Sequence, residues 1–149
     1  MIQTIQVQGT EKRLYQLIAP LVMNPDVLSA NNNYPFKTTE HYVWFIAVDK
    51  KSVVGFMPVE RRRSGCVINN YYVCDDNRET LSLLITTTLE AIGSEVRLCA
   101  VVMVEHQAVF EKHGFIVEKA WKRYVKMQKD EWWLKQQLPL KMYMSCLLY

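Results

Sequence analysis

The fold is decided by the stretch HYVWFIAVDKKSVVGFMPVERRRSGCVINNYYV, residues 41–73. It contains three mainly apolar runs, HYVWFIAV, SVVGFMPV and CVINNYYV, which are separated by the polar DKK and the basic RRRSG. Apolar runs rich in β-branched and aromatic residues, joined by short polar turns, are typical of an antiparallel meander of strands. Pro58 has no amide hydrogen, so the middle run is expected to lie at a sheet edge or to carry a bulge.

The flanking segments extend this meander into a mixed domain. Residues 2–7 alternate apolar and polar side chains as a strand does, and the apolar spacing after residue 10 predicts a helix that Pro20 kinks or restarts. A second helix is expected from CDDN at 74–77 to Gly93. The remaining segments predict a buried strand, a short helix ended by Gly114 and two closing strands. The order β-α-β-β-β-α-β-α-β-β predicts an α/β or α+β domain, with a mixed, mostly antiparallel sheet flanked by helices.

Composition limits the classes of protein. The chain has 149 residues, of which 50% are hydrophobic, so one core and a single domain are expected. The net charge of +3 is spread along the sequence, which gives no indication of a nucleic-acid partner. The start of the chain lacks the pattern of a signal peptide and no apolar run is long enough to span a membrane, so neither secretion nor a membrane partner is expected.

The cysteines and histidines do not form metal-site patterns. The four cysteines show no CxxC pair, and most lie in apolar runs, which suits buried reduced thiols and a cytoplasmic protein. His41, His106 and His113 do not pair with cysteines or carboxylates at metal-ligand spacing, so no metal site is expected.

The end of the chain is unusually apolar. Residues 131–149, EWWLKQQLPLKMYMSCLLY, would expose a large apolar surface if they were loose, and we expect them to form an extension that docks. Three partners are open: the chain's own domain, a second copy in a homodimer, and, least favoured because the segment has only two lysines, a membrane surface.

Four motifs in this order resemble the GCN5-related N-acetyltransferase (GNAT) superfamily. They are VVGF at 53–56, YYV at 71–73, a helix that begins at NRET (77–80), and FEKHGF at 110–115. The resemblance covers about residues 2–128. It implies an acyl-CoA N-acyltransferase-like domain at residues 1–130, acetyl-CoA as co-substrate, and a small-molecule or peptide amine as acceptor.

The resemblance also implies cofactor contacts. In the family, a strand ending like YV pairs with the pantetheine arm, and a turn of the form Arg/Gln-x-x-Gly-x-Gly/Ala places helix-start amides against the pyrophosphate. Arg78 matches the first position, but Leu81 and Leu83 replace the glycines, and Asp76 and Glu79 have the spacing of a capping box. The cofactor-binding residues implied are Tyr72, Val73, Arg78, Glu79, Thr80, Leu81, Ser82, Leu83, Phe110 and Lys112.

The catalytic residues are less well indicated. The family's Tyr-Glu-Lys-x-Gly-Phe segment often supplies a tyrosine that protonates the departing thiolate, but Phe110 stands at that position and has no proton to give. By residue type, Glu60 and His106 are candidates for the base and Tyr72 for the acid. Surface or packing roles are the alternatives for all three.

Two hypotheses follow from the sequence. The first is an N-acetyltransferase that transfers an acetyl group directly from acetyl-CoA to an amine. The second is a catalytically inactive module with the same fold, which acts through protein contacts, because the motif glycines and the tyrosine are missing.

Overall fold

The computed structural model describes residues 1–129, so the expected apolar extension at 131–149 lies outside the described residues. The helices and strands follow in the order β1 (Ile2–Gln8), α1 (Lys12–Val22), α2 (Pro25–Ala30), β2 (Tyr42–Asp49), β3 (Ser52–Arg62), β4 (Gly65–Ile68), β5 (Tyr72–Val73), η1 (Cys74–Asp76), α3 (Arg78–Ile92), β6 (Leu98–Met103), η2 (Val104–His106), α4 (Gln107–Lys112), β7 (Phe115–Ala120) and β8 (Tyr124–Lys129). The predicted order is confirmed, except that the third expected strand is divided into β4 and β5 and that the order did not include the short helix α2. None of the helices within residues 1–129 has the length and apolarity needed to cross a bilayer.

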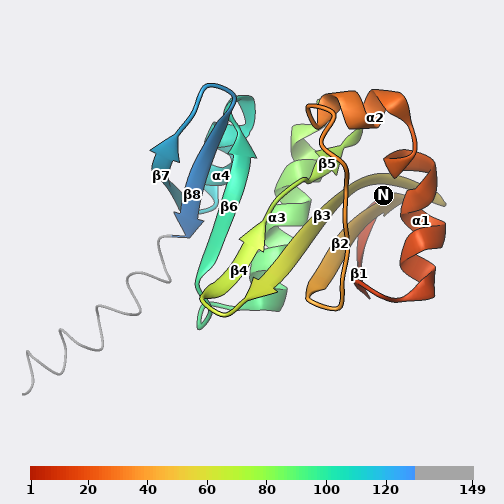
Figure 1. The fold of residues 1–149 in the computed structure, drawn as a ribbon, viewed down its shortest axis with the longest axis horizontal. Helices are drawn as coiled ribbons and strands as arrows, with labels where there is room; N and C mark the ends of the chain where they lie inside the picture. The colour runs from red at the N-terminus through yellow and green to blue at the C-terminus, as the bar shows by residue number, and fades with distance from the viewer. Residues whose placement is uncertain (130–149) are drawn as a thin grey trace, which may run out of the picture.

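The strands form one mixed sheet in the order β1-β2-β3-β4-β6-β8-β7, and β5 pairs with β3 (Figure 1). Among the described strands, β4 and β6 are the one parallel pair, and the other pairings are antiparallel. The predicted mixed, mostly antiparallel sheet is therefore confirmed.

Helices cover both faces of the first half of the sheet. Leu84 of α3 shares one apolar cluster with Phe45 of β2, whereas Leu14 of α1 shares a second cluster with Trp44. Neighbouring residues of β2 thus point into different cores, because successive side chains of a strand alternate between faces. This explains why β2 is apolar from Tyr42 to Val48 and does not alternate with polar residues.

The sheet divides where β4 ends. β4 pairs with β6 only at Cys66–Ile68, and β5 then stays beside β3 while β6 continues beside β8, so the two halves diverge (Figure 1). The break at residues 69–71 lies opposite Pro58, whose carbonyl accepts a hydrogen bond from the Asn69 amide at 3.5 Å and whose nitrogen has no hydrogen to return. Asn70 takes a φ of 57°, a conformation that asparagine tolerates. The edge alternative for Pro58 is wrong, since β3 lies inside the sheet and the interruption is in its partner.

Gly55, in the VVGF motif, is expected to be intolerant of a side chain. A Cβ there would lie 2.9 Å from the carbonyl oxygen of Tyr72 and 3.3 Å from Cδ1 of Leu84, so backbone or core atoms would have to move. We expect Gly55→Ala to lower the free energy of unfolding by about 1–3 kcal/mol, the range for overpacked sites, measured by urea denaturation. Ser52→Ala, at the exposed start of the same strand, is the control; equal stability of the two variants would refute the close packing of β5 on β3.

Candidate functional site

A cavity of about 360 Å³ opens where β5 and β6 diverge. No described strand pairs with the second edge of β5. The parallel strands β4 and β6 end at Ile68 and Met103, and the cavity lies beyond these carboxyl ends. In open sheets, ligands bind at the carboxyl ends of parallel strands that separate. Its lining residues are Ala30, Asn31, Tyr71, Tyr72, Val73, Asp75, Asp76, Met103, Glu105 and His106.

Two further hollows adjoin this cavity. One of about 330 Å³ shares Ala30, Met103 and Glu105 with it. Another of about 260 Å³ lies against the break between β4 and β5, and Asn70 and Tyr124 are among its lining residues. The second and third hollows share Asn32 and Tyr124, so the three follow one another between the two halves of the sheet, and we call them together the cleft.

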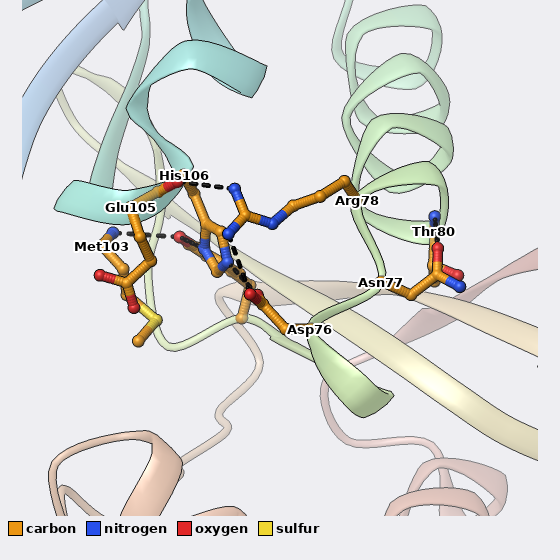
Figure 2. A network of polar contacts seen from close by, with 8 residues as sticks. Asp76, Asn77, Arg78, Thr80, Met103, Glu105 and His106 are labelled. Carbon is orange, nitrogen blue, oxygen red and sulfur yellow. Dashed lines mark hydrogen bonds and ion pairs between the residues drawn. The ribbon is translucent and has the colours of Figure 1, made fainter.

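A chain of hydrogen bonds follows the wall of the main cavity from Tyr71, through His106 of η2, to Asp76 of η1. The Tyr71 hydroxyl lies 2.7 Å from His106 Nδ1, and His106 Nε2 lies 2.5 Å from Asp76 Oδ1, as Figure 2 shows for the second pair. The Met103 amide donates to the same hydroxyl at 3.0 Å. Since that oxygen already accepts from Met103, its own hydrogen is free to donate to Nδ1, and a neutral His106 with its proton on Nε2 then satisfies every member.

Burial and charge hold the protons of this chain in place. Burial raises the pKa of Tyr71 well above its usual value, although the hydrogen bond from the Met103 amide opposes this. Burial also acts to raise the pKa of Asp76, but hydrogen bonds from His106 and Arg78 outweigh it, and the net pKa lies below the ordinary value. Tyr71 is therefore a phenol and Asp76 a carboxylate at neutral pH.

Arg78 ties the start of α3 to η2 across one end of the cleft. Its Nη1 donates to the Glu105 carbonyl at 2.6 Å, and its Nη2 donates to Asp76 Oδ2 at 2.9 Å (Figure 2). An isolated ion pair between two side chains this exposed contributes little to the stability of a protein. Here the pair is joined to the buried His106, so Asp76 links an exposed cation to a buried imidazole.

The expected capping box at the start of α3 is wrong. Asn77 caps the helix, and its side-chain oxygen accepts from the Thr80 amide at 2.9 Å. Asp75 and Asp76 have φ values of 55° and 52°, so the chain turns there and the helix begins one residue later than the capping box requires. This leaves the Asp76 carboxylate to His106 and Arg78, and leaves Glu79 exposed.

The structure places Tyr72, Val73 and His106 in the wall of the main cavity. Arg78 does not line the three hollows, but it bonds to Asp76 and Glu105, which line the main cavity. Burial raises the pKa of Tyr72 to about 12, so this hydroxyl also keeps its proton at neutral pH. Glu60 lines none of the three hollows and pairs with Arg62 at 2.8 Å.

The other expected contacts lie away from the main cavity or in the core. Leu81 and Phe110 are fully buried, Leu83 is half-buried, and Lys112 is exposed at the end of α4. Ser82 bonds to His113 at 2.7 Å, and Thr80 is buried. Sequence reasoning missed Tyr71 and Asp76 as partners of His106. The available signal was the strand order, which brings the end of the third run beside the end of β6.

Comparisons with known proteins agree with this architecture. No family model matches the sequence, and no curated protein matches it. Among solved structures, ElaA of Escherichia coli superposes with a TM-score of 0.71 at 17% identity, covering 87% of this chain and 99% of that one. An acyl-CoA N-acyltransferase from Pseudomonas aeruginosa gives a TM-score of 0.68 at 13% identity, with coverage of 87% and 99%. The PaiA N-acetyltransferase of Thermoplasma acidophilum, solved in complex with coenzyme A, gives 0.57 at 9% identity, with coverage of 87% and 98%.

These matches define the class of fold. The chain has the acyl-CoA N-acyltransferase fold, and the GNAT-like architecture that the motifs implied is confirmed over the described residues.

Proposed function

We propose that this protein is a divergent member of the GNAT superfamily that transfers an acyl group, acetyl in the first instance, from coenzyme A to an amine of a small molecule or peptide. The observation that carries this proposal is the cleft between β5 and β6. It lies at the carboxyl ends of the parallel pair, in a chain with the acyl-CoA N-acyltransferase fold.

The residues present are compatible with such a donor. Tyr72 and Val73 line the cavity from a strand with one open edge, which suits backbone hydrogen bonds to the amides of a pantetheine arm. Arg78 provides a cation at the start of a helix of 15 residues, whose dipole also favours an anion. When bound, an acyl-CoA would supply the activated thioester carbonyl.

The chain's own groups can hold and move a proton beside this cleft. Tyr71 donates toward His106 Nδ1, and the Asp76 carboxylate accepts from Nε2. If Tyr71 takes a proton from the attacking amine while its own proton passes to Nδ1, the phenol is restored and the Asp76 charge stabilises the resulting imidazolium, as a carboxylate does for a catalytic histidine. We therefore place general acid and base roles with Tyr71 and His106 and give Asp76 a positioning role, while Tyr72 stays a candidate acid.

The expected compartment and assembly also remain proposals. Cys66, Cys74 and Cys99 are free thiols, which is compatible with a reducing cytoplasm. A homodimer through residues 131–149 is still a prediction, and comparing the mass in solution with and without that segment tests it.

A second candidate function has its own observation. The Thr80 amide is already capped by Asn77, and Asp75, Asp76 and Glu79 place negative charge around the helix start. Both features oppose a pyrophosphate, and they favour a catalytically inactive module that acts through protein contacts.

Calorimetric titration with acetyl-CoA separates the two candidates. We expect binding with a dissociation constant in the micromolar range, about −8 kcal/mol, and a rise in the melting temperature. Glu60→Gln, which alters a residue outside the cleft, should bind equally well. No heat and no thermal shift at about 1 mM ligand would reject the acyltransferase and leave the inactive module.

A further inference from the structure

Arg78 is the one basic residue within residues 74–83, a stretch that also contains Asp75, Asp76 and Glu79. Its guanidinium already donates to the Asp76 carboxylate at 2.9 Å and to the Glu105 carbonyl at 2.6 Å. An anionic ligand at this end of the cleft meets a cation that is committed to an internal carboxylate.

We infer that Asp76 is a specificity-determining residue that competes with phosphate-bearing ligands for Arg78 and so sets the affinity of the cleft for them. This inference rests on the proposed function for the identity of the ligand, coenzyme A. A phosphate that binds Arg78 has to share the guanidinium with the Asp76 carboxylate, and two negative charges beside one guanidinium repel each other. Asp76 therefore weakens the phosphate-dependent part of binding and leaves the phosphate-free part unchanged.

The two oxygens of Asp76 have separate partners, which makes the inference testable with one substitution. Oδ1 accepts from His106 Nε2 at 2.5 Å, and Oδ2 accepts from Arg78 (Figure 2). In Asp76→Asn the amide oxygen can still accept from His106, but the amide nitrogen cannot accept from Arg78. Asparagine also tolerates the φ of 52° at this position, so the turn before α3 is preserved.

Asp75 offers a matched control. It lies next to Asp76, lines the same cavity and has a φ of 55°, but the hydrogen bond and the ion pair to Arg78 come from Asp76. Asp75→Asn therefore removes the same charge from the same turn without freeing Arg78. The difference between the two variants isolates the competition from the general change in charge.

The experiment is calorimetric titration of the wild type, Asp76→Asn and Asp75→Asn with coenzyme A, pantetheine and inorganic pyrophosphate. We expect Asp76→Asn to bind coenzyme A and pyrophosphate about tenfold more tightly than the wild type, whereas Asp75→Asn gains no more than about threefold. Pantetheine, which carries no phosphate, should bind all three proteins equally. Equal affinities of the two variants for coenzyme A and pyrophosphate would overturn the inference.

The probes also separate this inference from the proposed function. If neither coenzyme A nor pantetheine binds any of the proteins, the acyltransferase proposal fails. Pyrophosphate then decides the role of Asp76: tighter binding by Asp76→Asn than by Asp75→Asn supports the competition, and equal or absent binding rejects it. If coenzyme A binds the wild type and both variants alike, the proposed function stands and the inference about Asp76 fails.

Discussion

Replacing Phe110 with alanine is expected to lower the free energy of unfolding by about 3–5 kcal/mol, the range for removing a buried aromatic ring. Phe110 is fully buried, and its ring centroid lies 5.6 Å from that of Tyr71 and 5.3 Å from that of Phe115. The ring thus packs α4 against Tyr71, in the break between β4 and β5, and against the start of β7. Urea denaturation at constant pH measures the loss.

Lys112 provides the control for this prediction, because it lies on the same helix but is exposed. Lys112→Ala should change the stability by no more than about 0.5 kcal/mol. A loss of under about 1 kcal/mol for Phe110→Ala would mean that α4 is not packed on the sheet as described. The expected result would also explain the phenylalanine in the FEKHGF motif, since the ring serves the core and carries no proton to the cleft.

Apart from the short helix α2, local patterns were sufficient to predict the order of the elements. The continuous apolar run of β2 and the apolar stripe of α3 each depend on residues close together in the sequence. Such a pattern indicates whether one face or both faces of the element are buried. The division of the third predicted strand into β4 and β5 depends instead on how both pair with β3. Pro58 signals a missing amide hydrogen, but only the position of the partner strand shows that the break falls at Asn70.

The candidate site was less predictable because its contacts join distant segments. Tyr71 and His106 are 35 residues apart, and Asp76 and His106 are 30 apart. The family motif located the helix start correctly in sequence, but the packing of its apolar stripe on the sheet sets the rotation of α3. With 3.6 residues per turn, Leu81 then falls on the buried face and Ser82 falls toward His113. A motif match places residues along the chain, whereas the packing of the core decides which way they face.

The second large effect is expected from removing a single oxygen atom, in Tyr71→Phe. The hydroxyl accepts from the Met103 amide at 3.0 Å and lies 2.7 Å from His106 Nδ1, and both tyrosine and histidine are almost fully buried. Phenylalanine keeps the ring and its packing but leaves one donor and one acceptor without a partner. At about 1–3 kcal/mol for each of the two unsatisfied groups, the free energy of unfolding should fall by about 2–6 kcal/mol.

Tyr72→Phe is the matched control for this prediction, because it removes the neighbouring hydroxyl from a side chain that is partly exposed. Its cost should stay under about 1 kcal/mol, since water can solvate what remains. Amide hydrogen exchange locates the effect. In Tyr71→Phe the Met103 amide should exchange faster than in the wild type. Amides in the β1–β2 pair keep their hydrogen bonds, so their protection against exchange should decrease only as far as the global stability does. Unchanged protection at Met103 would show that another group holds the end of β6. Loss of protection at Met103 would show that the Tyr71 hydroxyl replaces the missing strand as partner of this backbone amide, where β5 and β6 separate. The cleft can then exist without an unsatisfied Met103 amide in its wall.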